Sequence, residues 1–313
     1  MEYDVVYRFD GPMTPPLSRR IADVIFHDIV RPLASVLSPK GLDLLNRALS
    51  LPAGLTLLAI APEETWEYLR AVGHPEGLAG RVQFARRKAL ERFRGDAFYF
   101  HPWARVRKGP GLTRFESSGT PGVLVTWNCF LAKSLIGLVA EQDARVIRFP
   151  YDGEGEPEET PSRWERWSAY KASVRARVFG PYQIVPGATP FAYVRALREG
   201  RSLFVLQDVP DPTGASPRRR LLGRLFSLPV GAVRIARAAG APLYFITHRF
   251  QDGELWADVD GPHEMDEQAL LDRISEEIRQ RPWAWELWRN VLSEHSVSQT
   301  HAAPAQPAAR AYA

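Results

Sequence analysis

The sequence contains a single cysteine, Cys129, in 313 residues. One cysteine excludes an internal disulfide and any metal site built from several cysteines, and it suits a reducing compartment. No metal framework is visible in the rest of the sequence. We therefore expect this chain to hold neither a metal nor a cofactor.

Long hydrophobic runs are also missing. The longest apolar stretch, residues 51–61, is shorter than the roughly 20 residues that a membrane-spanning helix needs. The first residues, Met1-Glu-Tyr-Asp, are acidic and lack the basic and apolar regions of a signal peptide. We therefore expect a cytoplasmic protein without a transmembrane helix, which can still lie on a membrane surface.

The remaining composition is that of an ordinary soluble globular chain, with 45% hydrophobic and 24% charged residues. Lys and Arg number 40 against 36 for Asp and Glu, which gives a net charge of +4 and a pI of about 9.3. The excess is mild, but it is rich in arginine and locally clustered. It therefore favours partners with anionic surfaces.

Hydrophobic spacing divides the chain into three parts. Apolar residues recur every three or four positions through residues 15–50, which predicts a helical N-terminal region over 1–80. Strand-like and helix-like segments then alternate after residue 123, which favours βαβ units. We predict an α/β domain over 81–295 with a mixed, largely parallel central sheet flanked by helices. The tail, 296–313, is rich in Ala, Pro, Ser and Gln and is predicted to be disordered.

The stretch 119–134 predicts a strand that turns sharply into a helix. Val123–Thr126 is a short β-branched and aliphatic run, and helical spacing begins at Phe130. The turn around Asn128 presents unpaired N–H groups at the start of the helix, where negative charge is favoured. Open α/β sheets usually place their chemistry at such a turn. The alternative is that Asn128 only caps the helix.

Two basic segments are candidates for binding anionic partners. Residues 81–94 combine apolar positions at helical spacing with six basic residues, which predicts an amphipathic basic helix. Residues 210–226 form a predicted loop with clustered arginines beside leucine and phenylalanine. This mixture suits a phosphate-bearing, apolar partner such as a lipid. Both segments also fit a purely structural role, with solvated charges and apolar side chains packed inward.

Four later segments follow one another in a recognisable order: Arg195–Asp208, Gly223–Phe226, Ala238–Arg249 and the Trp-rich Arg281–Arg289. In this order they resemble the late lipid A (lauroyl/myristoyl) acyltransferases of the lysophospholipid acyltransferase superfamily. The resemblance covers about residues 80–290, and it implies an α/β protein at the inner membrane. It also implies transfer of an acyl chain from an acyl carrier protein or coenzyme A thioester to a lipid or sugar hydroxyl or amine.

The resemblance further implies a catalytic dyad at the central turn, a histidine followed five residues later by an acid. In such a dyad the imidazole takes a proton from the attacking hydroxyl, and the carboxylate orients the ring. Matching the strand Val123–Thr126 places Asn128 at the histidine position and Lys133 at the acid position. Asparagine is not basic, and lysine is protonated at neutral pH unless burial lowers its pKa, so the dyad is replaced; a lysine with a lowered pKa at position 133 is one alternative base. A distant histidine, with His101 and His248 the strongest candidates, can still approach the turn.

Further candidate site residues lie near the ends of predicted elements. For substrate binding, the resemblance implies Arg148, Arg177 and Asp208, and the arginine-rich loop adds Arg218, Arg219 and Arg220. Cys129, next to the replaced histidine, is a candidate acyl acceptor, because thiols at helix N-termini ionise more readily. The alternatives are a buried inert cysteine and surface or capping charges.

These observations leave three hypotheses for the function. The first is an acyltransferase with an atypical active site, which takes an acyl carrier protein or coenzyme A thioester and a lipid acceptor at an anionic membrane surface. The second is a catalytically dead relative that binds lipid or acyl donor as a non-enzymatic partner. The third is nucleic-acid binding, which we disfavour because the aromatic residues cluster at the C-terminal end instead of alternating with the basic ones. Acyl donor, chain length, acceptor and oligomeric state stay open.

Overall fold

The computed structural model describes residues 29, 31–34, 36–60, 63–74, 77–97, 107–127, 129, 145–147, 190–208, 216–228, 231–251 and 254–285. The predicted tail over 296–313 lies outside these residues.

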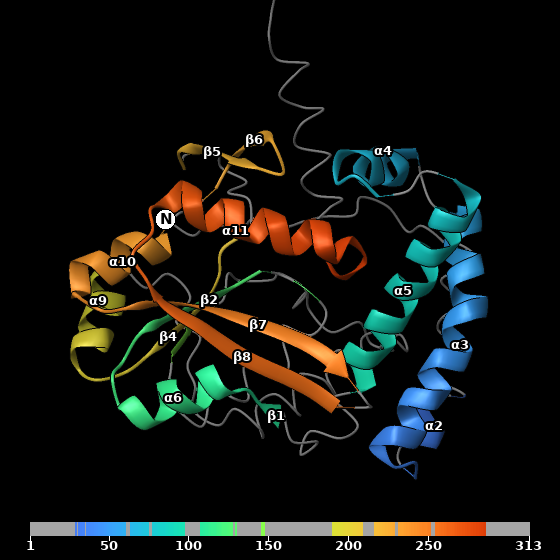
Figure 1. The fold of residues 1–313 in the computed structure, drawn as a ribbon, viewed down its shortest axis with the longest axis horizontal. Coiled ribbons are helices and arrows are strands. Elements are labelled where there is room, and N and C mark those ends of the chain that lie inside the picture. The colour runs from blue at the N-terminus through green and yellow to red at the C-terminus, as the bar shows by residue number, and fades with distance from the viewer. Residues whose placement is uncertain are drawn as a thin grey trace, which may run out of the picture.

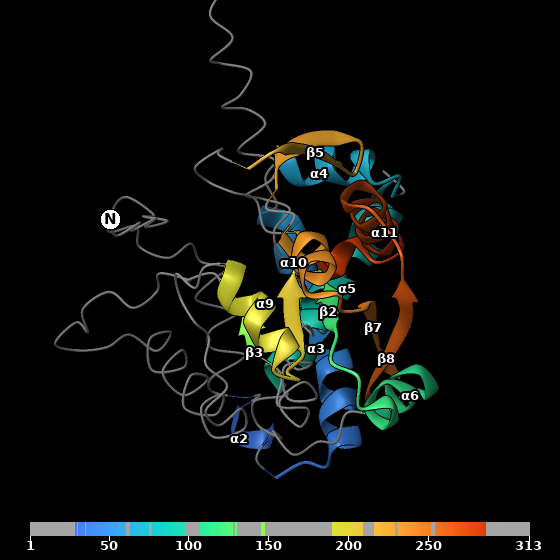
Figure 2. The same cartoon turned by 90° about the vertical axis from the view of Figure 1, so that its left-hand side faces the viewer.

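Helices surround a central sheet (Figures 1 and 2). In chain order they are α2 (Arg31–Ala34), α3 (Pro39–Ile60), α4 (Glu63–Ala71), α5 (Leu78–Ala97), α6 (Pro110–Ser118), α9 (Pro190–Arg198), α10 (Gly231–Ala239), α11 (Glu267–Gln280) and the short 3-10 helix η2 (Pro282–Ala284). The basic helix predicted over 81–94 is confirmed, because it forms the larger part of α5.

The described strands form one six-stranded sheet and one separate hairpin. Across the sheet, the order is β1 (Arg107–Lys108), β8 (Glu254–His263), β7 (Leu243–Gln251), β2 (Val123–Thr126), β4 (Leu203–Leu206) and β3 (Arg145–Ile147). Strands β7 and β8 are antiparallel, and the other neighbouring pairs are parallel. The predicted α/β class with a mixed, largely parallel sheet is therefore confirmed.

Strand β2 lies inside the sheet, and all four of its residues are buried. A continuous apolar run is typical of a parallel strand that is covered on both faces. Val125 is in register with Val205 of β4 on one side and with Phe245 of β7 on the other. Because these three strands run parallel, their carboxyl ends meet at one edge of the sheet, which we call the carboxyl edge.

The arginine-rich segment predicted as a loop over 210–226 contains a two-stranded hairpin. Strand β5 (Arg218–Leu221) pairs antiparallel with β6 (Arg224–Ser227). The residues between them are Leu222 and Gly223, with φ values of 53° and 80°. Two consecutive positive φ values match a type I′ turn, whose twist suits a hairpin. The exposed arginines obscured the strand pattern, because only one side chain of each short strand is buried.

Helices α3 and α5 pack side by side at the carboxyl edge, with α5 nearer the sheet (Figure 1). Gly54 of α3 allows this close approach, since a Cβ atom there would lie 2.7 Å from the Cα of Arg86 in α5. Near the C-terminal end of α5, the guanidinium of Arg94 lies 4.3 Å from the ring centroid of Phe250 in β7. Helix α5 therefore connects the N-terminal helices to the carboxyl edge.

Candidate functional site

A cysteine and a histidine from distant parts of the sequence meet at the carboxyl edge. Cys129 follows the end of β2, and His248 lies in β7, 119 residues further along the chain. The Sγ of Cys129 lies 2.8 Å from the Nε2 of His248, within hydrogen-bonding distance. Their exposed fractions are only 0% and 4%. The sequence singled out both residues, but their pairing depends on the parallel register of β2 and β7.

His248 is neutral at neutral pH. Burial lowers the pKa of His248 well below its ordinary value of 6.5, and the positive charge of Arg281 lowers it further. A neutral imidazole accepts a hydrogen bond at one nitrogen and donates from the other. We assign the ring proton to Nδ1, because this tautomer lets the thiol of Cys129 donate to Nε2.

Two buried ring nitrogens near Cys129 have no hydrogen-bond partner within the described part of the chain. They are Nδ1 of His248 and Nε1 of Trp127, whose rings lie 6.1 Å apart between centroids. Leaving a buried donor unpaired costs about 1–3 kcal/mol, so such a group needs an explanation. Both groups lie with the Cys129–His248 contact at the carboxyl edge.

Asp208, a predicted substrate-binding residue, lies at the same edge just after β4. Its Oδ2 accepts a hydrogen bond of 2.6 Å from Nε1 of Trp285, and both side chains are buried. Trp285 also forms an isolated antiparallel bridge with Cys129. Asp208 therefore holds the segment after α11 against the carboxyl edge.

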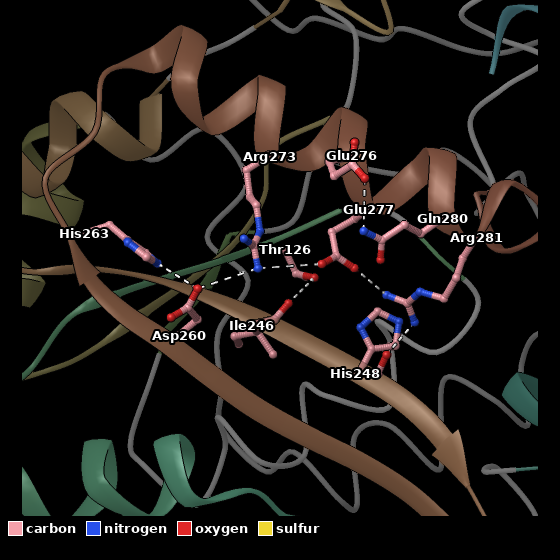
Figure 3. Close-up of polar contacts among 10 residues, drawn as sticks. All are labelled: Thr126, Ile246, His248, Asp260, His263, Arg273, Glu276, Glu277, Gln280 and Arg281. Carbon is pink, nitrogen blue, oxygen red and sulfur yellow. Dashed lines mark hydrogen bonds and ion pairs between the residues drawn. The ribbon is translucent and has the colours of Figure 1, made fainter. Parts of the chain in front are cut away.

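Arg281 connects the end of α11 to β7 (Figure 3). Its guanidinium donates to the backbone oxygen of His248 and, at 2.9 Å, to Oε2 of Glu277. The same guanidinium lies 5.3 Å from the ring centroid of Trp127. Arg281 thus fixes the backbone at His248, while its charge opposes protonation of the imidazole.

The three predicted arginines of β5 lie elsewhere. The hairpin is on the far side of α11 from β7, so Arg218, Arg219 and Arg220 are not brought to the Cys129–His248 pair (Figures 1 and 2). An open surface hollow of about 620 Å³ is lined by Arg218, Arg219, Arg220, Leu225, Gln268 and Asp272. Nη2 of Arg219 lies 2.7 Å from Oε2 of Glu267 in α11, and this ion pair joins the hairpin to that helix.

The other predicted site positions, Asn128, Lys133, Arg148 and Arg177, lie outside the described residues, as does His101. Within the residues that are described, no group of three or more His, Cys, Asp or Glu side chains is arranged to hold a metal ion. None of the described helices is both long enough and apolar enough to cross a bilayer.

No protein-family model matches this chain, and no curated protein matches it either.

Proposed function

We propose that this protein is an acyltransferase in which Cys129 receives the acyl chain and His248 transfers the protons. The observation that supports this most is the 2.8 Å contact between a thiol and an imidazole at the carboxyl edge. A nucleophile beside a base is the usual arrangement for covalent catalysis. In this proposal the pair acts in place of the dyad that Asn128 and Lys133 cannot form. The sequence resemblance supplies the reaction class.

In the first step, Sγ of Cys129 attacks the carbonyl carbon of an acyl carrier protein or coenzyme A thioester. Its proton moves to Nε2 of His248 as the new S–C bond forms. The bond between the acyl carbon and the donor sulfur then breaks, and the leaving thiolate takes the proton from His248. The products are acyl-Cys129 and the free thiol of the donor.

In the second step, a hydroxyl or amine of a lipid or sugar acceptor attacks the acyl carbon on Cys129. His248 takes the proton of the attacking group, and the bond between Sγ and the acyl carbon breaks. The Cys129 sulfur recovers the proton from His248. The ester or amide product leaves, and the thiol and imidazole return to their starting states.

Electrostatics explains why the pair is neutral before the donor binds. The burial and the nearby Arg281 charge that lower the pKa of His248 make an imidazolium unfavourable in the resting site. Negative charge that develops on the thioester oxygen during attack would offset this penalty. The indole N–H of Trp127, which lacks an acceptor among the described residues, is available to donate to that oxygen.

Burial of Cys129 has two consequences for this chemistry. Water is excluded from the sulfur, which protects an acyl thioester from hydrolysis. The donor also reaches the sulfur only when the side chains that cover it move aside. A slow first step is therefore expected.

We also propose that the protein works as a peripheral protein at the cytoplasmic face of an anionic membrane. Its sequence pI is about 9.3, and a lipid acceptor is held in a bilayer. Basic proteins are attracted to anionic lipid surfaces.

The test is incubation of the purified chain with radiolabelled long-chain acyl thioesters of acyl carrier protein and coenzyme A. We expect a hydroxylamine-sensitive label on Cys129 and its transfer to a lipid acceptor. Cys129→Ala should lose both, and His248→Phe should slow labelling by about 10²–10⁴-fold. Asn128→Ala and Lys133→Ala serve as controls and should still be labelled. Transfer by Cys129→Ala at the wild-type rate would overturn the proposal.

The burial of Cys129 also favours a second function. In this function the Cys129–His248 pair is structural, and the chain binds lipid or acyl donor without reaction. Cys129 has no exposed surface, and its backbone is bridged to that of Trp285. This function predicts donor binding with no label and no transfer, unchanged by Cys129→Ala. The labelling experiment therefore separates the two.

A further inference from the structure

The inner side of α3 is mostly polar or small. The buried residues Asp43, Asn46 and Ser50, together with Gly54, lie on the side of the helix that faces α5. Oδ1 of Asp43 accepts a hydrogen bond of 2.9 Å from Nε of Arg94 in α5. Small and polar residues on this side let the backbones of α3 and α5 approach closely.

The outer side of α3 is apolar. Leu44, Leu51 and Leu55 have exposed fractions of 69%, 47% and 50%. Ala48 and Pro52 are exposed between them, and this spacing places all five residues on one side of the helix. A helix at a water-exposed surface normally has the opposite arrangement, with apolar residues inward. We call these five residues the leucine face.

The exposed charges that α3 itself carries beside the leucine face are positive, and the carboxylate of Glu254 in β8, which acts on Lys40, is paired with Arg107 at 2.8 Å. Lys40 and Arg47 are exposed next to it, and Asp43, the only acidic residue of α3, is buried. Nε of Arg47 reaches Oδ2 of Asp43 at 2.8 Å, while its side chain stays 51% exposed. A leucine face with basic residues and no exposed carboxylate is typical of a helix that lies in the interface of an anionic membrane.

Apolar side chains are also exposed on the segment before α3. Leu33 of α2 and Val36 have exposed fractions of 40% and 78%. Exposed apolar side chains are therefore present on both α3 and the segment before it, and exposed apolar patches mark interaction sites.

We infer that the leucine face docks on an anionic lipid bilayer, with α3 lying along the surface of the membrane. The charges favour lipid over a second copy of the chain, since two leucine faces in contact would bring Lys40 and Arg47 together with no exposed acid on α3. The side chains of Leu44, Leu51 and Leu55 enter the acyl region, and the two cations contact phosphate groups.

Docking in this way relates the membrane to the site. Helix α5 lies between α3 and the sheet, and Nζ of its Lys88 is 3.5 Å from the backbone oxygen of Trp285, the residue bridged to Cys129 (Figure 1). The leucine face would thus hold the carboxyl edge close to the bilayer. This inference rests on the proposed function for the peripheral membrane attachment, and it is independent of the proposed chemistry at Cys129.

The test is co-sedimentation of the full chain with vesicles of phosphatidylcholine, with and without phosphatidylglycerol. We expect binding to the anionic vesicles that weakens as salt rises, because the charge interaction is screened. The double variant Leu44→Glu/Leu51→Glu should bind at least about tenfold more weakly. Lys40→Gln should weaken binding only to vesicles that contain phosphatidylglycerol.

The matched control is Phe191→Glu, which places the same charge at an apolar residue that is 82% exposed on α9, at the opposite end of the molecule (Figure 1). It should bind vesicles like the wild type. Equal binding by the double variant, or a dimer in analytical ultracentrifugation that the double variant abolishes, would overturn the inference. Labelling of Cys129 by acyl-coenzyme A without vesicles tests the proposed function alone, and the double variant should retain it.

Discussion

Trp285 donates a hydrogen bond of 2.6 Å from its indole Nε1 to the buried carboxylate of Asp208. The residues lie 77 positions apart in the sequence, and their contact holds the end of the described chain against β4. The Trp285 ring also packs against Tyr68 of α4, with centroids 5.7 Å apart. This one tryptophan therefore joins the N-terminal helices, the sheet and the Cys129–His248 pair.

We predict that Trp285→Phe destabilises the protein by about 2–3 kcal/mol, because a buried carboxylate loses a hydrogen bond and bonds to charged groups are the stronger ones. Urea denaturation measures the change in the free energy of unfolding. Trp283→Phe is the matched control, since Trp283 packs against Arg87 instead, with the guanidinium 4.2 Å from its ring centroid. Equal losses for the two variants would show that the Asp208 contact adds no stability.

Stability should depend on pH through His248. Its pKa is lowered by burial in the folded state, so between that value and 6.5 the unfolded chain binds more protons than the folded one. The contribution of His248 to the free energy of unfolding is fully present above pH 6.5. It falls as the pH drops from 6.5 towards the lowered pKa of the folded state.

Comparison of the wild type with His248→Phe isolates the contribution of His248 to the pH dependence of stability. Glu91, whose pKa is raised by burial, acts in the opposite direction, but it is present in both proteins and cancels in the difference. We expect the wild type to lose stability relative to the variant as the pH falls below 6.5. Parallel stability curves in urea titrations at several pH values would contradict this assignment.

Removal of the indole donor of Trp127 should slow acyl transfer. If its N–H stabilises the oxygen of the thioester, Trp127→Phe lowers kcat by about 10²-fold and changes KM little. The measured quantity is the rate of Cys129 labelling at saturating donor. Trp256→Phe is the control, because its Nε1 is also buried without a partner among the described residues but lies in β8. Similar rates for both variants would exclude a role for Trp127 in the reaction.

Contact between α3 and α5 should depend on Gly54. A Cβ atom there would lie 2.7 Å from both Cα and N of Arg86, so Gly54→Ala forces the two backbones apart. We expect a loss of about 1–3 kcal/mol, larger than the gain of about 1 kcal/mol in helix propensity.

Gly41→Ala in the same helix is the control, since its nearest contact for a new Cβ is a side-chain atom at 3.4 Å. This variant should be as stable as the wild type or more so. Thermal and urea unfolding measure both. An unchanged stability of Gly54→Ala would mean that the helices separate without penalty.

The sequence alone predicted the fold class, because local hydrophobic patterns determine it. The buried run of Val123–Thr126 and the later alternation of strands and helices predicted a largely parallel sheet, as observed. Local patterns were insufficient where few side chains are buried. The short strands of the arginine hairpin were predicted as a loop, and β1 and α6 were not predicted at all.

The candidate site was only partly predictable. The sequence indicated the turn after β2 and named Cys129, His248 and Asp208 separately, since each lies at or near the end of a buried strand. It did not show which of them touch. The sequence also did not predict that the leucine face of α3 is exposed. Periodicity shows that a helix has an apolar side but not whether that side points inward or outward.

Tertiary structure decided these questions through register and burial. The alignment of β2 with β7 determines that Cys129 meets His248, and the burial of both determines that the imidazole is neutral. A sequence specifies which residues prefer a strand and which prefer the interior. Only the packing of distant segments determines which buried polar groups become partners, because that depends on distances of a few ångströms between elements that are far apart in the chain.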